Sequence, residues 1–314
     1  MATFKTITGI GLLSCALLQS AWAQEPASCE KVRFAEIGWA DIAATTGVAM
    51  VLTEGLGYDP SKVMASVPIA FTGVKNKQID AFLGYWSPSM DAVIEPFAKN
   101  DGVRVLESPN LEGAKYTLAV PSYTAEAGLK SFQDIAKFKE QLGGRIYAIE
   151  PGNDGNLLIE KMIKSDQFGL GGFRMIESSE AGMLVQVQRA IRKKEPVVFL
   201  GWAPHPMNAQ YDLTYLAGGD DVFGPDYGAA KVFTVVASDY LDRCANVGKL
   251  LKNLQFTVPI ESELMQMALD KGDPQTVAKN WIKANPAALD QWLDGVTTYD
   301  GQDGVAAVKK FVGL

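Results

Sequence analysis

The chain has 314 residues, of which 47% are hydrophobic and 21% are charged, with a formal net charge of −7 at pH 7. Acidic and basic residues are interspersed and form no basic stripe, so nucleic acid is excluded as a partner. The length is sufficient for two lobes of ordinary domain size, each with its own core.

The amino terminus has the pattern of a secretory signal peptide. Lys5 precedes an apolar stretch from Ile7 to Leu18, and Ala21-Trp22-Ala23 forms a small-x-small cleavage site. The alternative is a lipoprotein signal ending at Cys15, but the apolar run continues past this cysteine. No later stretch reaches the roughly 18 apolar residues of a membrane span. We therefore expect cleavage after residues 1–23 and a periplasmic mature protein.

Predicted strands and helices then alternate along the chain. An apolar strand at 32–38 is followed by a helix at 41–56. The same order recurs, which predicts a mostly parallel sheet flanked by helices. Further strands are expected at 63–70, 81–85, 117–120, 146–149, 197–200 and 232–236, and further helices at 73–78, 131–139, 157–164 and 181–193.

The last third of the chain is predicted to be helical. Amphipathic segments at 261–270, 274–284 and 286–293 are separated by glycine- and proline-containing breaks. Trp281 and Trp292 lie in these segments at helical spacing among apolar residues. We expect both tryptophans in the core rather than beside a ligand.

Cleavage of the signal would leave two cysteines, Cys29 and Cys244. Two cysteines in an exported protein favour a single disulfide, and the alternative is a pair of unrelated buried thiols. A bridge between them would mean that the chain begins and returns within the same lobe.

The reactive residues do not form a recognisable catalytic centre. His205 is the only histidine and lies between two prolines. No HExxH, paired CxxC, P-loop, GxGxxG or GxSxG motif is present. The segment Asn153-Asp154-Gly155-Asn156 is too short for a calcium loop. We therefore expect no enzyme activity, no catalytic residue, no metal and no cofactor.

Aromatic residues instead occur at the ends of predicted strands. Residues 82–90 and 199–207 share an apolar strand that ends in Trp and then Pro, which places Trp86 and Trp202 in equivalent positions. Trp39 follows the first strand, and Tyr116 precedes the strand at 117–120. Ligands of open α/β sheets bind at the carboxyl ends of strands. Each aromatic taken singly has core packing as its alternative.

A cluster of aromatic rings is suited to a quaternary ammonium group. Such a cation has no N–H to donate, whereas ring faces offer apolar contact and cation–π attraction. Asp41, close to Trp39, either caps the following helix or accepts a ligand hydroxyl and balances the cation. Asn153 either caps an ordinary strand-to-helix turn or binds a polar ligand tail.

Five motifs carry a family resemblance that spans nearly the whole mature chain. The sequence resembles the glycine betaine/choline class of ABC-transporter substrate-binding proteins, and its choline-binding members in particular. The motifs are Gly38-Trp39-Ala40-Asp41, Gly84-Tyr85-Trp86-Ser87-Pro88, Lys115-Tyr116-Thr117-Leu118, Pro151-Gly152-Asn153-Asp154-Gly155-Asn156 and Leu200-Gly201-Trp202-Ala203-Pro204, together with the Trp281 and Trp292 helices.

The resemblance implies an α/β fold of the two-lobe, type II periplasmic-binding-protein kind, closing as a flytrap about a two-stranded hinge. Lobe I would comprise residues 24–113 and 214–314, and lobe II residues 114–213. The partners implied are choline or a related quaternary amine and the membrane permease of an ABC transporter, with the protein itself a monomer.

The same resemblance implies a ligand site. Trp39, Trp86, Tyr116 and Trp202 would form an aromatic box around the ammonium group, and Asp41 and Asn153 would hold the choline hydroxyl. A Cys29–Cys244 bridge also fits the choline-binding members. Asp41 would repel the carboxylate of a betaine, which favours choline. Glycine betaine, carnitine, proline betaine and acetylcholine remain alternative ligands, and an exported enzyme acting on choline-like substrates is the remaining alternative.

Overall fold

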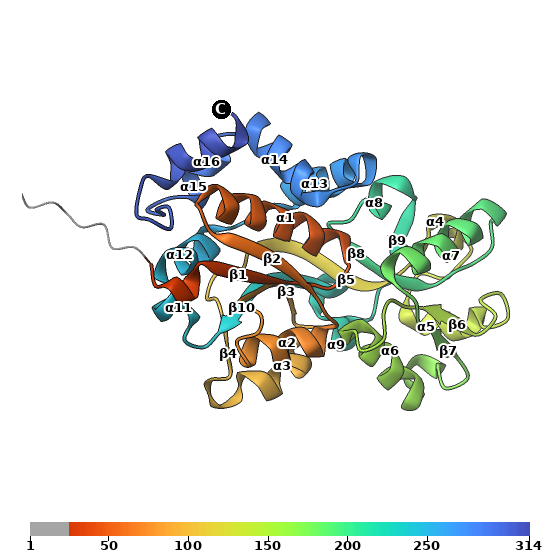
Figure 1. The fold of residues 1–314 in the computed structure, drawn as a ribbon. Helices are drawn as coiled ribbons and strands as arrows, with labels where there is room; N and C mark the ends of the chain where they lie inside the picture. Colours follow the sequence, from red (N-terminus) through yellow and green to blue (C-terminus); the bar gives the residue numbers. More distant parts are fainter. Residues whose placement is uncertain (1–24) are drawn as a thin grey trace, which may run out of the picture.

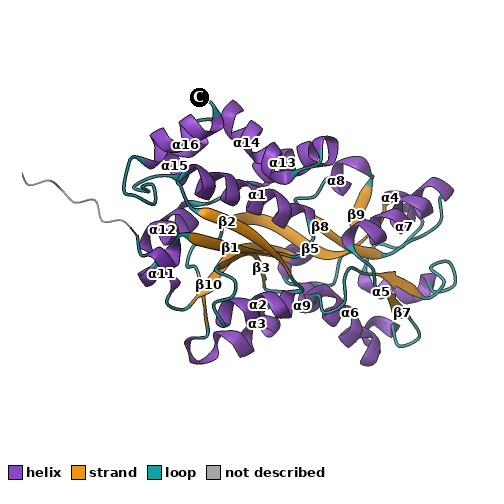
Figure 2. Cartoon of the chain, viewed as in Figure 1, coloured by secondary structure: helices purple, strands orange, loops and turns teal. Residues whose placement is uncertain are grey.

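The computed structural model describes residues 25–314, apart from the side chain of Lys271. The signal peptide expected at residues 1–23 lies outside the described residues. Strands run through the middle of the molecule with helices on both sides (Figure 2). The chain is therefore α/β, as the alternating pattern predicted.

The first part of the sheet forms from the amino-terminal third and one late strand. Its strands follow the order β2-β1-β3-β10, in which the first three are parallel and β10 is antiparallel to β3. The elements are β1 (Lys31–Glu36), α1 (Ala40–Gly55), β2 (Asp59–Met64), α2 (Val67–Lys75), β3 (Ala81–Ser87), α3 (Asp91–Ala98), β4 (Val103–Val105) and β10 (Ala229–Ala237).

The second part forms from the middle of the chain, in the order β5-β8-β6-β7. Helices lie around it on the right of Figure 1. The elements are β5 (Leu111–Pro121), α4 (Ser122–Glu126), α5 (Phe132–Ile135), β6 (Arg145–Tyr147), α6 (Asp154–Lys164), β7 (Arg174–Ile176), α7 (Glu180–Lys193), β8 (Phe199–Ala203), α8 (Met207–Gln210), β9 (Leu213–Tyr215), α9 (Asp220–Phe223) and α10 (Pro225–Gly228).

Strand β5 connects the two parts of the sheet. Lys115 is paired with Ala229 of β10 on one side and with Ala203 of β8 on the other. The beginning of β5 thus belongs to the first part and its end to the second. Strand β9 pairs with the end of β5, so residues 213–215 lie with the second part.

Three of the carboxyl-terminal helices, α13 (Val258–Lys271), α14 (Pro274–Ala284) and α16 (Gly304–Val312), pack against α1 and lie along the upper edge in Figure 1. Gly47 makes this packing close, because a Cβ there would stand 2.8 Å from the Pro274 carbonyl oxygen. Trp281 and Trp292 are 4% and 2% exposed, which confirms the prediction that both are core residues. The elements are α11 (Tyr240–Arg243), α12 (Ala245–Asn253), α13 (Val258–Lys271), α14 (Pro274–Ala284), α15 (Ala288–Trp292) and α16 (Gly304–Val312).

Several expectations about the elements were wrong. The helix expected at 73–78 is displaced, because α2 already ends at Lys75. The sheet is mixed rather than mostly parallel, because β5 and β10 run antiparallel to their neighbours where the two parts of the sheet join. The strand expected at 63–70 is split: β2 ends at Met64 and α2 begins at Val67. A short apolar run does not distinguish strand from helix, but Pro68 in the first turn is typical of a helix start.

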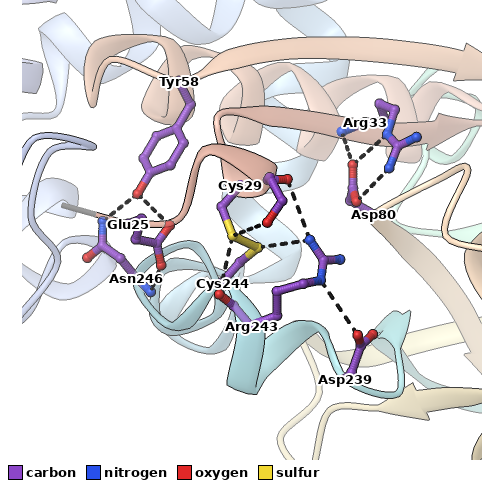
Figure 3. Close-up of a disulfide and its surroundings, with 10 residues drawn as sticks. Glu25, Cys29, Arg33, Tyr58, Asp80, Asp239, Arg243, Cys244 and Asn246 are labelled. Carbon is purple, nitrogen blue, oxygen red and sulfur yellow. Dashed lines mark hydrogen bonds and ion pairs between the residues drawn. A yellow bond between two sulfur atoms is a disulfide. The ribbon is translucent and has the colours of Figure 1, made fainter.

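The disulfide between Cys29 and Cys244 is present, with the two Cα atoms 5.5 Å apart. It joins the segment before β1 to the start of α12 (Figure 3). The carboxylate of Glu25 strengthens the same junction by accepting from the Asn246 amide and from the Tyr58 hydroxyl. The chain therefore begins and returns on the same part of the fold, as a bridge would require.

Candidate ligand-binding site

Four aromatic side chains from separate elements meet at one pocket. Tyr116 is central: its ring centroid lies 6.0 Å from that of Trp86 and 6.3 Å from that of Trp202. Trp39 lines the same pocket, and each of the four is at most 6% exposed. The pocket is lined by Trp39, Asp41, Trp86, Met90, Tyr116, Ile149, Asn153, Asp154 and Trp202. All six residues expected at the site are thus brought together.

Strand geometry places these rings. Trp86 and Trp202 are the last but one residues of β3 and β8, at the carboxyl ends where the sequence pattern located them. Tyr116 lies inside β5 rather than before a strand, and it is directly opposite Trp202 in the antiparallel β5–β8 pair. Directly opposed residues project to the same face of a sheet. The pairing register therefore determines that these two rings meet.

Tyr116 is held by the turn that begins α6. Its hydroxyl donates to Asn153 Oδ1 at 2.9 Å, and that oxygen also accepts from the amides of Gly155 and Asn156. Asn153 is therefore a helix cap, one of the two roles considered for it. Gly155 permits the contact, since a Cβ there would stand 2.1 Å from the Tyr116 hydroxyl oxygen. Burial raises the pKa of Tyr116 well above its usual range.

Two buried carboxyl groups face the pocket. Asp41 is 2% exposed and lies in the first turn of α1, where Trp39 and not Asp41 occupies the N-cap position. Burial, with the nearby Glu180 carboxylate, raises the pKa of Asp41 to about 8. Asp154 is 1% exposed and is the first residue of α6. Burial raises its pKa to about 6.

Two hydrogen bonds connect the start of α1 to the opposite wall of the pocket. The Trp39 indole Nε1 donates to Glu150 Oε1 at 3.0 Å, and the Ala40 amide donates to Glu180 Oε2 at 3.0 Å. Glu180, the first residue of α7, thereby caps α1 from another segment of the chain. We call this pair of bonds the cross-pocket contacts.

His205 supports the second of these contacts. Its Nδ1 accepts from the Met207 amide at 3.0 Å, so the proton of the neutral ring is on Nε2, which lies 3.1 Å from Glu180 Oε1. The imidazole also packs edge to face on Trp202, with ring centroids 5.0 Å apart. The lone histidine thus has a structural position between the aromatic rings and the start of α1.

Several residues that line the pocket or bond to the start of α1 beside it were not anticipated from the sequence. Glu150 and Glu180 lie 111 and 140 positions from their hydrogen-bond partners, so no local pattern could reveal them. Met90 and Ile149 are ordinary apolar residues in the sequence. Asp154 could have been found from the sequence, because it directly follows Asn153 in a turn that was expected to bind the ligand.

Between residues 25 and 314, no group of three or more His, Cys, Asp or Glu side chains is arranged to hold a metal ion. In the same range, no helix combines the length and apolar character needed to cross a membrane. The aromatic and polar groups that line the pocket are four aromatic rings, two carboxyl groups and one amide.

Comparison with known proteins defines the class of this protein. Residues 30–284 match the family described as the substrate binding domain of ABC-type glycine betaine transport system. The chain belongs to this family, whose members are transporter substrate-binding proteins. Its fold is accordingly that of the type II periplasmic binding proteins.

The most informative relative is an ABC-transporter choline-binding protein solved in complex with choline. It is 52% identical, with a TM-score of 0.90, and the match covers 92% of this chain and 100% of that one. An ABC-transporter choline-binding protein solved in an unliganded semi-closed conformation is also 52% identical, with a TM-score of 0.84. The match covers 91% of this chain and 100% of that one. The glycine betaine/carnitine transport binding protein GbuC of Listeria monocytogenes is 32% identical over 52% of this chain and 54% of its own.

Proposed function

We propose that this protein is a periplasmic choline receptor that captures choline in the aromatic box and delivers it, chemically unchanged, to an ABC permease. The observation that carries the proposal is the convergence of four aromatic rings and two buried carboxyl groups on one pocket. Aromatic faces attract a trimethylammonium group that offers no hydrogen-bond donor. The relative solved with choline supports the same ligand.

The absence of basic residues in the pocket lining favours choline over betaines. The helices α1 and α6 both begin at the pocket, and helix starts normally attract anions. Here each start carries an aspartate, Asp41 or Asp154, on the pocket side. A betaine carboxylate would meet these acids without an arginine or lysine among the lining residues to compensate. Choline carries only a hydroxyl, which Asp41 and Asn153 can bind.

Closure of two lobes about a hinge is part of the proposal. We assign the hinge to β5 and β10, the two strands paired where the parts of the sheet join, with Gly113 at a φ of +81° beside the crossing. The boundary at which the chain passes from lobe I to lobe II is kept near Ala114, which pairs with Ala230 of β10. The second boundary, expected near Leu213, is better assigned beyond residue 224, because β9 pairs with the end of β5.

A receptor for glycine betaine or carnitine is the second candidate, favoured by the family description and by the GbuC similarity. Titration calorimetry of the purified mature protein with choline, acetylcholine, glycine betaine and carnitine separates the two. We expect choline to bind with a micromolar or lower Kd, about −8 kcal/mol or better. Tighter binding of glycine betaine or carnitine than of choline would replace the proposal by the second candidate.

A further inference from the structure

Asp154 has an arrangement that its place in the turn does not explain. It is 1% exposed and lines the pocket, yet neither of its carboxylate oxygens has a hydrogen-bond partner among the described residues. A buried carboxylate without hydrogen bonds is strongly unfavourable unless another charge compensates it. The described residues therefore do not provide the hydrogen-bond donor or positive charge that would compensate the Asp154 carboxylate.

The two hydroxyl groups near Asp154 donate their hydrogen bonds to other acceptors. The Ser89 hydroxyl donates to the Trp86 carbonyl oxygen at 3.3 Å, and the Tyr116 hydroxyl donates to Asn153 Oδ1. Asn153 itself accepts from the first turn of α6. Ser89 lies close enough to Asp154 to lower its pKa, but in this geometry its hydroxyl donates to the Trp86 carbonyl oxygen and neither Asp154 oxygen has a hydrogen-bond partner. The pocket neighbours of Asp154 are otherwise mainly aromatic.

A quaternary ammonium group fits this environment. Its charge is delocalised over methyl groups that cannot donate a conventional hydrogen bond, so a carboxylate can balance it only through space. An amine or guanidinium guest would instead need hydrogen-bond acceptors in fixed directions. The aromatic faces of the pocket match the first kind of cation, and the Asp154 carboxylate beside them can supply the balancing negative charge.

The other pocket acid, Asp41, has different neighbours. Glu180 and Glu36 lie close enough to disfavour its charge, and Asp41 in turn disfavours that of the buried Glu261. Burial, together with these neighbouring acids, raises the pKa of Asp41 to about 8, whereas burial raises the pKa of Asp154 only to about 6, so Asp154 ionises more readily than Asp41. A ligand with one positive charge needs one negative charge to balance it. Because the two acids differ in how readily they ionise, we expect them to have different roles.

We propose that Asp154, rather than Asp41, is the counter-charge that selects a cationic guest, while a neutral Asp41 exchanges hydrogen bonds with the guest's hydroxyl. This inference rests on the proposed function, because it takes a quaternary ammonium alcohol as the ligand. It predicts that Asp154 makes the affinity depend on the charge of the ligand and that Asp41 makes it depend on the ligand's hydroxyl.

The test compares choline with its neutral carbon analogue, in which a tert-butyl group replaces trimethylammonium. The two ligands have the same shape and hydroxyl, so the ratio of their affinities measures the response to charge. Asp154→Asn should lower this ratio by about tenfold or more, as loss of a close charge pair in a partly desolvated site implies. Asp41→Asn should weaken both ligands and leave the ratio within about twofold of the wild type.

Asp154→Ser serves as a second removal variant, and thermal melts establish that each variant is folded. An unchanged ratio in Asp154→Asn and Asp154→Ser would overturn the assignment, as would an equal fall of the ratio in Asp41→Asn. If the wild type binds neither choline nor the analogue, the proposed function itself fails. Binding of choline with an unchanged ratio in the Asp154 variants defeats only the further inference.

The pH dependence of choline binding gives a second readout that does not need the analogue. Glu150 and Tyr116 are the titratable groups facing Asp154, and Asp41 lines the same pocket. Only ionised Asp154 attracts the cation, so wild-type affinity should fall as the pH is lowered from about 7 to about 5. Asp154→Asn should abolish this fall. A variant that keeps the full decline would assign it to Glu150 or Asp41 and overturn the proposal.

Discussion

Tyr116 shows how single residues determine this pocket. Its ring contacts Trp86 and Trp202, and its hydroxyl reaches the cap of α6 at Asn153. One side chain therefore connects the aromatic faces to the polar wall. Trp86 and Trp202 were recognisable in the sequence because they stand at strand ends. Tyr116 instead lies inside β5, and the role of Asp154 depends on which groups surround it.

Loss of one tryptophan face should weaken binding strongly. Trp86→Ala or Trp202→Ala removes both apolar contact and cation–π attraction, and we expect choline affinity to fall by about tenfold or more. Trp281→Phe, in the carboxyl-terminal core, is the matched control and should leave affinity unchanged. Titration calorimetry measures both, and equal affinities in all variants would remove the aromatic box from the mechanism.

Gly155→Ala should weaken choline binding without unfolding the protein. The added Cβ would stand 2.1 Å from the Tyr116 hydroxyl oxygen, so the ring must shift out of the box. Tyr116→Phe removes that oxygen, and the double variant should recover part of the affinity lost by Gly155→Ala. A double-mutant cycle measures this coupling. Strictly additive losses of binding free energy would mean that the added Cβ at Gly155 does not clash with the Tyr116 hydroxyl.

At the scale of elements, the start of α1 depends on a partner from another helix. Trp39 at the N-cap offers no side-chain acceptor, and Glu180 of α7 accepts from the Ala40 amide instead. If the two lobes separate, this cap is lost. If the proposed closure about β5 and β10 occurs, we expect the cross-pocket contacts to stabilise the closed form.

Glu180→Ala should shift the protein towards the open form and weaken choline binding. Loss of a helix cap is worth about 1 kcal/mol, which corresponds to a roughly fivefold loss of affinity. Small-angle scattering with and without choline measures closure, and calorimetry measures affinity. Glu160→Ala is the control, because Glu160 pairs only with Lys164 on its own helix. Equal affinities for the two variants would contradict a role for Glu180 in closure.

Elements with strong local signals were predictable. Helix α14 has the expected bounds, 274–284, because Asp273-Pro274 starts it and Asn285-Pro286 follows it. The strand expected at 63–70 failed because an apolar run alone has no period that separates strand from helix. Helix α16 was not anticipated, although Asp303 caps it and Gly313 ends it with a φ of +83°.

At the scale of the whole molecule, the disulfide joins the two ends of a 215-residue interval. Cys29 and Cys244 are both fully buried, and the bridge fastens the first turn of the described chain to α12 (Figure 3). The aromatic box lies on other elements. Stability and binding are therefore expected to respond separately to loss of this bridge.

The double variant Cys29→Ser, Cys244→Ser should lose about 2–5 kcal/mol of unfolding free energy while keeping its choline affinity below the melting transition. Denaturant titration measures the first quantity and calorimetry the second. Reduction of the wild-type protein, which breaks the bridge without introducing a serine, controls for the effect of the serines themselves. A large loss of affinity in the folded double variant would show that the bridge also positions the pocket.

The sequence by itself indicated the α/β class and the candidate aromatic residues, because strand ends, caps and residue chemistry are local properties, and it favoured a bridge because only two cysteines remain after the expected cleavage. Only the tertiary structure decided which acids face the pocket with unpaired oxygens and which segments meet across it. Burial and neighbouring charge set the state of Asp41 and Asp154, and the contacts of Glu150 and Glu180 join positions more than a hundred residues apart. Such properties arise from the folded arrangement, in which distant segments exclude water together.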